Sequence, residues 1–533
     1  MPTRSSTDAT DATDGTAVPA VANHLARALA ADLRDAGFTA AALREAWGQD
    51  ADDALGRGLR LPAERALAHR TDALAVLARL LVLGMAQPSD GVASALPTTG
   101  VAGLVDLLLC ADDGTTVTPV ASLRPQEIAD DACSAEWYVV SDLDETALGA
   151  QPLPVDHVLG AGGASLTLAA LQLPTPAQSV LDLGTGCAIQ SLRARRYATT
   201  VVATDLSARA LRFAALNLAL NEVDDVELRA GSLYEPVLGQ RFSRIVSNPP
   251  FVITPRDPEM PAYDYRDGGM EGDALVEAVI SGAGEHLEPG GIAQLLGNWE
   301  YLAVHGDGRE QVEISGLDRV RAWVEASESP LDAWVVEREL LDPVRYAEMW
   351  IRDGGILPGT GEHTRLLQAY LEDFERRGVT SIGLGYVLLR RPADGIVSLE
   401  RYEQVPQALP GEAGLGAHLA GVLDRHDELR ALDDQALLDR AARTAPDVTE
   451  VRHHIPGEPG PVVVELRQGS GFARTQQVRA ELAAVVGACD GDLTLGQILT
   501  AVAALMDLDA EEARAELVPP LRALINDGFL TIE

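Results

Sequence analysis

The segment between residues 179 and 251 constrains the fold of this chain more than any other. It contains three apolar runs, at residues 180–183, 200–205 and 244–247, which are short and rich in β-branched side chains. Helical patterns separate these runs from one another. Alternating strands and helices are typical of a parallel, doubly wound sheet with helices on both faces. We therefore predict an α/β fold for this part of the chain.

A glycine-rich turn follows the first run, and an acid ends the second. The turn contains Gly184, Thr185 and Gly186, and Asp205 lies about 20 residues further on. Because glycine has no side chain, the backbone N–H groups of such a turn approach a ligand closely. An acid in this place can accept both hydroxyl groups of a ribose. The spacing suits a dinucleotide as well as an adenosyl ligand, so by itself it predicts only a nucleoside-binding cleft.

The third run leads into an Asn-Pro-Pro-Phe motif at residues 248–251, which distinguishes between the two ligands. With this motif the segment resembles the class I S-adenosylmethionine-dependent methyltransferases that modify amide or amino nitrogens. That set includes HemK-type release factor glutamine methyltransferases, adenine amino-methyltransferases of DNA or RNA, and small-domain guanine methyltransferases of ribosomal RNA. The resemblance covers residues 156–392. Ala188 stands where the family often has a third glycine, which tightens the turn without excluding the ligand.

The resemblance implies a catalytic role for each residue of the motif. An amide or aromatic amine nitrogen has a delocalised lone pair, and two acceptors in line with its N–H bonds favour a more tetrahedral nitrogen and stabilise its developing positive charge. In the family these acceptors are the asparagine side-chain oxygen and the first proline carbonyl, here Asn248 and Pro249. Pro250 stiffens the loop, and Phe251 offers a face on which a planar amide or base stacks. The alternative is a plain Pro-Pro turn after a buried strand.

The resemblance also implies a binding site for S-adenosylmethionine. The residues expected to contact this cofactor are Gly160, Asp182, Gly184, Thr185, Gly186, Asp205, Leu206, Ser232 and Asn248. The family usually has an acid at the position of Ser232, which leaves the adenine contact open. In the wider family the segment at residues 156–167 closes over the methionine end of the cofactor. A helix N-cap with a flexible lead-in is the alternative for this segment.

Further patterns complete a Rossmann-like, seven-stranded methyltransferase core. The remaining strands are expected at residues 226–230, 292–296, 333–340 and 381–389. Helical stretches at residues 343–351 and 364–377 are inserted between the last two strands, either facing the substrate or only packing. Trp299, after the fifth strand, either borders the crevice or packs. The glycine-rich, acidic loop at residues 263–272 resembles that of HemK-like enzymes and favours a protein substrate.

The chain has 533 residues, which suggests about three domains. The expected divisions are a disordered tail at residues 1–18, a helical and then β-rich accessory domain at 19–150, the methyltransferase domain at 151–395, a helical linker at 396–446 and a winged-helix-like domain at 447–533. The accessory domain begins with short helices, arranged as a winged helix or as a plain bundle. The last domain has 14 acidic residues against 6 arginines, which favours protein contact or a structural role over DNA recognition.

Composition restricts the partners. The net charge is −38 and the sequence contains no lysine, which indicates a GC-rich coding bias, a salt-adapted surface or both. So acidic a surface repels polyanions at long range. The four cysteines lack metal-site spacing, and we expect His453 and His454 to be ordinary strand or loop residues, so no metal site is predicted. We see no apolar leader and no membrane-spanning run, so we expect a cytoplasmic protein without membrane contact.

Together these patterns predict an S-adenosylmethionine-dependent N-methyltransferase. The favoured acceptor is a glutamine-like side chain of a protein, by resemblance to the HemK-like enzymes. The alternatives are an adenine or guanine amino group in RNA or DNA, and a cofactor-binding scaffold without turnover. Arg193, Arg195 and Arg196, on the helix after the glycine-rich turn, are expected on a solvated outer face, not in a nucleic-acid patch.

Overall fold

The computed structural model describes residues 19–129, 134–148, 154–256, 268–305, 311–409, 411, 414–457 and 460–533. The chain divides into two compact units. The larger comprises Met1–Ile128, Ala135–Ala169 and Ala177–Glu403, and the smaller comprises Ala129–Ser134, Ala170–Pro176 and Gln404–Glu533. The tail predicted to be disordered, residues 1–18, lies outside the described residues.

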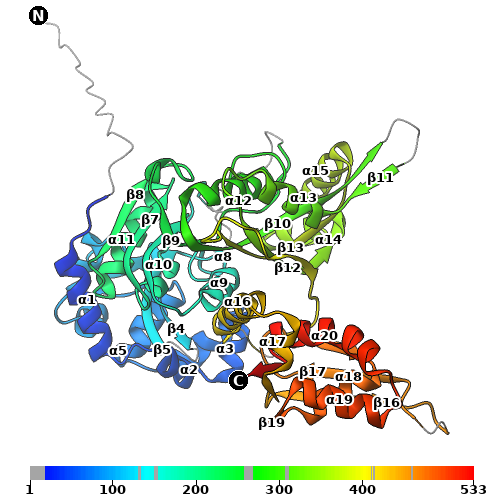
Figure 1. The fold of residues 1–533 in the computed structure, drawn as a ribbon. Coiled ribbons are helices and arrows are strands. Elements are labelled where there is room, and N and C mark those ends of the chain that lie inside the picture. The colour runs from blue at the N-terminus through cyan, green and yellow to red at the C-terminus, as the bar shows by residue number, and fades with distance from the viewer. Residues whose placement is uncertain are drawn as a thin grey trace, which may run out of the picture. The chain divides into compact units, whose positions relative to one another are not determined.

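A mixed sheet forms the centre of the larger unit (Figure 1). Its strands are β6 (Ala177–Leu183), β7 (Ala198–Asp205), β8 (Val226–Ala230), β9 (Phe242–Ser247), β10 (Leu287–His305), β11 (Gln311–Ile314), β12 (Asp332–Leu341), β13 (Val379–Arg390) and β14 (Glu400–Gln404). Strands β8, β7, β6, β9 and β10 are parallel neighbours in that order, and β13 and then β12 follow with antiparallel pairing. This confirms the Rossmann-like methyltransferase core. The structure adds β14 beside β12 and β11 beside β10 to the seven strands that we predicted.

Strand β10 differs from the prediction at both ends. It is 19 residues long where five were expected, and it contains Trp299 within its length. Trp299 is fully buried, and its indole N–H donates to the Glu337 carboxylate on β12 at 2.6 Å. Of the two alternatives for this tryptophan, packing inside the sheet is therefore the correct one.

Helices cover this sheet and connect its strands. They are α9 (Gly163–Leu171), α10 (Ile189–Ala194), α11 (Ala208–Leu220), α12 (Ala274–His286), α13 (Gly316–Glu325), α14 (Pro343–Asp353) and α15 (Gly361–Arg377), with a short 3₁₀ turn at Glu235–Val237. The sequence specifies their ends locally: the Ser207 hydroxyl accepts from the Ala210 N–H and caps α11, and Gly378 ends α15 with a φ of +72°. Arg193 on α10 is only 2 % exposed and donates to the Ala169 carbonyl at 3.3 Å, so the expectation of a solvated face is wrong for this arginine.

The accessory part of the larger unit is helical and then β-rich, in the order that we predicted. It contains α1 (Asn23–Asp35), α2 (Ala40–Trp47), α3 (Gln49–Leu55), α4 (Leu61–Leu67), α5 (Ala73–Leu77), the π-helical turn Ala78–Val82, β1 (Gln87–Pro88), α6 (Ser89–Ala95), α7 (Gly100–Asp106), β2 (Cys110–Asp112), β3 (Thr116–Pro119), β4 (Ala121–Ala129), β5 (Ser134–Asp142) and α8 (Glu145–Leu148). Strands β4 and β5 pair with each other.

Helix α11 joins the accessory part to the core. The Asn217 amide accepts from the Val140 N–H at 2.7 Å and donates to the Val140 carbonyl at 2.9 Å. One helical turn later, Asn221 makes the same two bonds with Tyr138, at 2.9 and 2.8 Å. These carboxamides pair with β5 as the peptide groups of a neighbouring strand would, so they fix β5 against the core.

The smaller unit contains two three-stranded sheets and five helices among its described residues. Its elements are α16 (Leu415–Ala431), α17 (Asp434–Leu438), β15 (Ala441–Thr444), β16 (Val448–His453), β17 (Val463–Gln468), β18 (Thr475–Val478), α18 (Ala480–Ala488), β19 (Asp490–Thr494), α19 (Leu495–Leu505), α20 (Ala510–Asn526) and β20 (Leu530–Ile532). The Thr494 capping box explains where α19 begins.

The expected helical linker at residues 396–446 is not uniformly helical. It contains β14, which belongs to the large sheet, and β15, which lies between β19 and β20. We predicted helix for residues 441–444, but here they pair on both sides as the central strand of a small sheet, and this long-range pairing overrides a local helical pattern.

Across the described ranges, no helix is long and apolar enough to cross a membrane, and no group of three His, Cys, Asp or Glu side chains is arranged to hold a metal ion. His453 lies in β16 and contacts the Glu465 carboxylate at 3.3 Å. Cys110, Cys187 and Cys489 are buried free thiols, and Cys133 lies outside the described residues.

Candidate active site

The glycine-rich turn follows β6 at the carboxyl end of the parallel strands. Gly184 and Gly186 have φ values of +75° and +54°, which glycine adopts more readily than other residues. A Cβ atom on either would meet nothing within 4 Å, so both backbones border open space. Ala188 also has a positive φ, +64°, a conformation that costs an alanine about 1–2 kcal/mol. The third glycine common in the family would relieve this strain.

Asp205 ends β7 beside this turn. Its carboxylate accepts the Gly186 N–H at 2.9 Å through one oxygen and the Ser207 N–H at 2.9 Å through the other. These bonds hold the carboxylate between the turn and the start of α11.

Asp182 braces the turn from below. It is fully buried, and one carboxylate oxygen accepts from the Thr185 hydroxyl at 2.7 Å and the Ser191 hydroxyl at 2.6 Å. Its other oxygen is buried and has no hydrogen-bond partner among the residues that the structure describes. Burial, together with the negative charge of Asp205, raises the pKa of Asp182 to about 6.

A cavity of about 450 Å³, here called the glycine cleft, opens above these residues. Of the residues expected to contact a cofactor, those that line the cleft are Gly160, Gly184, Thr185, Gly186, Asp205, Leu206, Ser232 and Asn248. Asp182 does not line it, because its side chain lies beneath the turn.

The chemistry of the glycine cleft fits an adenosyl ligand. Two bare glycine backbones and a carboxylate suit a ribose, as the sequence predicts. Leu206, which is 74 % exposed, and Leu233 line the cleft and provide apolar surface for a planar base. Ser232 lines the cleft beside Leu233 and offers a hydroxyl group. The residues present therefore fit S-adenosylmethionine.

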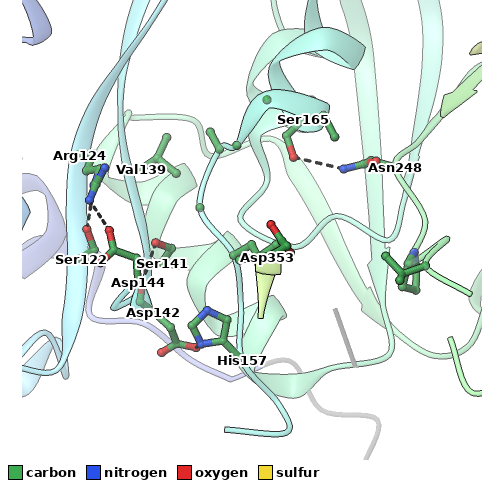
Figure 2. Close-up of a pocket in the computed structure, with 18 of the residues that line it drawn as sticks. Ser122, Arg124, Val139, Ser141, Asp142, Asp144, His157, Ser165, Asn248 and Asp353 are labelled. Carbon is green, nitrogen blue, oxygen red and sulfur yellow. Dashed lines mark hydrogen bonds and ion pairs between the residues drawn. The ribbon is translucent and has the colours of Figure 1, made fainter. Parts of the chain in front are cut away.

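The Asn248 side chain lies at one end of the glycine cleft. Its amide N–H donates to the Ser165 hydroxyl at 3.3 Å, a bond visible in Figure 2. Its side-chain oxygen, Oδ1, is buried and has no hydrogen-bond partner in the described part of the chain. Asn248 also lines a second cavity, as do Pro249 and Pro250, so the motif forms part of the wall between the two.

The second cavity, here called the aromatic cavity, has a volume of about 520 Å³. Its walls come from four parts of the chain: strands β4 and β5, the loop at residues 160–165, the Asn-Pro-Pro-Phe motif, and the end of α14. Phe251 lines this cavity and not the glycine cleft. Its ring meets the edge of Trp350 on α14, with 6.3 Å between ring centroids.

Helix α14 is fixed against the motif by a buried tyrosine. The Tyr346 hydroxyl accepts the Ile253 N–H at 2.9 Å and the Asn298 side-chain N–H at 2.7 Å. Because Trp350 follows Tyr346 by one helical turn, the same contact holds its ring beside Phe251. Trp350 and Asp353 belong to the insertion between β12 and β13, so part of this insertion lines a cavity beside the motif.

The far end of the aromatic cavity is polar (Figure 2). Arg124 on β4 forms an ion pair with Asp144 at 2.7 Å. Asp142 on β5 accepts from the Arg209 guanidinium at 2.8 Å and from the Val158 N–H at 2.9 Å. Burial lowers the pKa of His157, although Asp142 lies 3.9 Å away and opposes this shift. Together with Asp353, the described lining of this cavity contains three carboxylates and one arginine.

Sequence reasoning missed most of the aromatic cavity. Arg124 and Asp144 lie in the accessory part and belong to no motif. His157 and Ser165 lie in the segment at residues 156–167, but no role was predicted for either residue. Part of the loop at residues 263–272 lies outside the described residues, but Gly268, Gly269 and Met270 line the glycine cleft.

Three family models match this chain. Residues 161–302 match the methyltransferase small domain, and residues 35–120 and 420–532 match two domains of unknown function, DUF7059 and DUF7782. The first match covers the glycine-rich turn, Asp205 and the Asn-Pro-Pro-Phe motif. It ends before Trp350.

Among characterised proteins, the chain is similar to glutamine methyltransferases. The release factor glutamine methyltransferase of Xylella fastidiosa is 40 % identical over 131 residues, which is 23 % of this chain and 47 % of that protein. The ribosomal protein uL3 glutamine methyltransferase of Bradyrhizobium diazoefficiens is 30 % identical over 178 residues, 31 % of this chain and 53 % of that protein. This chain thus spans about half the length of the relatives that it matches.

Solved structures give a weaker likeness. A methyltransferase from Pyrococcus furiosus is 16 % identical with a TM-score of 0.23, covering 42 % of this chain and 77 % of that one. The family model and the curated relatives identify residues 161–302 as a methyltransferase small domain. This domain is homologous to the HemK-type release factor and uL3 glutamine methyltransferases, a family whose typical methyl donor is S-adenosylmethionine.

Proposed function

We propose that this protein transfers a methyl group from S-adenosylmethionine to the side-chain amide nitrogen of a glutamine in a protein partner. One observation carries this proposal: the buried Oδ1 of Asn248 has no hydrogen-bond partner in the described structure, and Asn248 lines both the glycine cleft and the aromatic cavity. A buried acceptor without a partner costs about 1–3 kcal/mol. A ligand that brings an N–H group to this oxygen removes that cost.

The glycine cleft is the cofactor side. Gly184 and Gly186 allow close backbone approach, and the Asp205 carboxylate is available to the ribose hydroxyls once it exchanges its present backbone bonds. Leu206 and Ser232 bound the base. When bound, S-adenosylmethionine supplies an electrophilic methyl group.

The aromatic cavity is the acceptor side. Asn248 Oδ1 and the Pro249 carbonyl accept the two N–H bonds of the glutamine amide, and this pairing localises the nitrogen lone pair. Phe251 stacks on the planar amide, held in place by the edge of Trp350. The bond between the methyl group and sulfur would break as the bond to the glutamine nitrogen forms, leaving S-adenosylhomocysteine, and the nitrogen would lose one proton to water. Preorganised acceptors of this kind contribute about 100- to 1000-fold in rate.

A protein partner is favoured over a nucleic acid. Three carboxylates and one arginine line the aromatic cavity, and the whole chain has a net charge of −38. A polyanionic substrate gains affinity from clustered cations, which this lining lacks. The relatives are named for glutamine methylation in release factors and in ribosomal protein uL3, which supports the same choice. A partner of the translation apparatus would place the reaction in the cytoplasm.

For the smaller unit we propose a winged-helix-like domain that contacts the protein partner. The order α18, β19, α19, α20, β20 supports this fold, with β15 as the third strand of the small sheet. Its excess of acidic residues supports protein contact over DNA recognition.

The test is methyl transfer in a lysate from cells that lack this protein, so that its acceptors are unmodified. Purified protein and S-adenosylmethionine with a labelled methyl group are added, and samples are digested with nuclease or with protease. We expect label that survives nuclease, is released by protease and maps to a glutamine by mass spectrometry. Label in a nucleoside would support base methylation instead, and absence of label despite cofactor binding would support a scaffold.

A further inference from the structure

We propose that Ser165 is a positioning residue that holds the Asn248 side-chain amide in place, with the amide oxygen presented to the acceptor. This inference rests on the proposed function, because it concerns how the same site presents a hydrogen-bond acceptor. Ser165 lies in α9, near the end of the loop that separates the glycine cleft from the aromatic cavity.

The two ends of the Asn248 side chain have different surroundings. The nitrogen donates to the Ser165 hydroxyl at 3.3 Å, while the oxygen is buried without a partner among the described residues. This orientation is the productive one, because a nitrogen facing the acceptor would oppose one N–H group with another. The Ser165 hydroxyl can both donate and accept, so its bond fixes where the amide lies, and the N–H group of the acceptor selects the orientation with Oδ1 toward it.

The Ser165 hydroxyl supplies what the productive orientation needs. With Oδ1 turned to the acceptor, the Asn248 N–H points at Ser165, whose oxygen has lone pairs to accept it. Without this hydroxyl, the N–H group would be buried unsatisfied in the productive orientation. The amide would then lose the bond that fixes its place between the two cavities.

Ser165 itself is held from two sides. Its carbonyl accepts the Gln190 side-chain N–H at 2.7 Å, and Gln190 is 3 % exposed on α10. At the start of the loop, a Cβ on Gly160 would lie 3.0 Å from the Ser141 hydroxyl of β5, so the loop approaches that strand closely. The Ser165 hydroxyl therefore has a fixed place from which it bonds the Asn248 amide.

The direct test observes the amide without turnover. The chain has only six asparagines, so labelling asparagine selectively with ¹⁵N gives at most six side-chain NH₂ signals. The Asn248 signal is identified by its loss in Asn248→Asp. We expect Ser165→Ala to shift this signal and to leave the other five in place, and Ser165→Thr, which keeps the hydroxyl, to restore it. An Asn248 signal unchanged by Ser165→Ala would overturn the inference.

Kinetics test the consequence. Ser165→Ala should lower kcat about 3- to 10-fold, the usual effect of one lost neutral hydrogen bond, with an unchanged calorimetric Kd for S-adenosylmethionine. Ser165→Thr should recover most of the rate. The matched control is Ser281→Ala on α12, which removes a hydroxyl bonded to the Glu277 carbonyl away from both cavities and should leave kcat unchanged. A weaker cofactor Kd with normal kcat would instead assign Ser165 to the cofactor.

A double-mutant cycle separates a positioning role from a general one. In the Asn248→Ala background, Ser165→Ala should cause no further loss, because Ser165 acts only through Asn248. An additional loss of the same size would overturn the inference. If glutamine methylation itself fails its test, the ¹⁵N experiment still decides whether Ser165 holds the Asn248 amide in place, so the two failures are distinguishable.

Discussion

The glycine cleft and the aromatic cavity share a wall but are built in different ways. The cleft is lined by several loops, most of them at the carboxyl ends of parallel strands, and nearly all of its lining falls within the match to the methyltransferase small domain. The aromatic cavity is assembled from four segments, and β4, β5 and α14 lie outside that match. The family match therefore covers most of the lining of the glycine cleft but only part of the lining of the aromatic cavity.

This difference suggests how function divides between the two cavities. A cofactor shared by many enzymes needs a constant turn, whereas an acceptor particular to one enzyme needs walls that vary. Walls contributed by an accessory domain and by an insertion can change without disturbing the turn. Variants on the two sides should therefore separate cofactor binding from acceptor recognition.

The largest effect is expected where the cavities meet. Asn248→Ala should lower the rate of methyl transfer about 100- to 1000-fold, because it removes a preorganised acceptor for the substrate nitrogen. Calorimetry should give a nearly unchanged Kd for S-adenosylmethionine. Asn23→Ala, at the exposed start of α1, is the control. Near-normal turnover of Asn248→Ala would mean that the motif is only a turn. The two cavities would then not meet at a catalytic residue.

The next effect concerns the stability of the turn. Asp182 has a folded pKa of about 6, raised from 3.8 mainly by burial, so the folded state holds its proton more tightly than the unfolded state. Stability therefore falls as pH rises from 4 to 6, by about 2–3 kcal/mol in total. Asp182→Asn should remove this loss, and its melting temperature relative to the parent protein should rise between pH 4 and pH 7.

Asp32 provides a control of opposite sign. Burial raises the pKa of Asp32, but N–H groups of Thr99 and Thr98 bond its carboxylate and lower the pKa overall. Its contribution is present at neutral pH and is lost as pH falls through the folded pKa. Asp32→Asn should thus cost more stability at pH 7 than at pH 3. The same pH trend in both variants would contradict the assignment for Asp182.

A third effect should be confined to the cofactor side. Asp205→Ala removes the acceptor for the ribose and leaves the Gly186 and Ser207 N–H groups without their present partner. We expect affinity for S-adenosylmethionine to fall by about 1–3 kcal/mol in calorimetric titration. Asp225→Ala, which breaks an exposed ion pair with Arg195, is the matched variant that should bind normally. If Asp205→Ala also binds normally, the glycine cleft is not the ribose site.

The smallest effect should be confined to the acceptor side. Trp350→Ala removes the edge contact with Phe251, worth about 0.5–1.5 kcal/mol, and should raise KM for the protein acceptor several-fold. The Kd for S-adenosylmethionine should not change. Met349→Ala, from the same helix but outside the cavity lining, controls for loss of packing on α14. Equal effects of the two variants on KM would mean that α14 only packs.

The comparison also explains what the sequence could predict. The turn, Asp205 and the motif are local patterns at fixed distances, and each reports directly on one strand end. The seven strands of the core follow from the same alternation. Asp182 shows the limit, because its position at the strand end gave no sign that Thr185 and Ser191 would draw its carboxylate beneath the turn.

The acceptor side could not be predicted in this way. Arg124 and Trp350 are more than 200 residues apart, and only the folded chain brings them to one cavity. The long β10 was also hidden, because Pro289, Gly290 and Gly291 indicate a turn although the strand continues past them. The pairing of β10 with β9 is irregular at this place, between Leu287 and Ile292, so the local signal survives as an irregularity inside the strand.

The two carboxamides of α11 have a consequence for how this protein can be divided. Asn217 and Asn221 each make two hydrogen bonds with the backbone of β5. These side chains therefore take the place of a neighbouring strand beside β5. A protein trimmed to residues 154–403 would keep the glycine-rich turn, Asp205 and the Asn-Pro-Pro-Phe motif, but it would remove the β5 partners of both carboxamides and leave only their bonds to the Cys187 and Asn217 carbonyls. The accessory residues before the family match thus supply hydrogen-bond partners to a helix inside it, and β5 belongs in any shortened form of the protein.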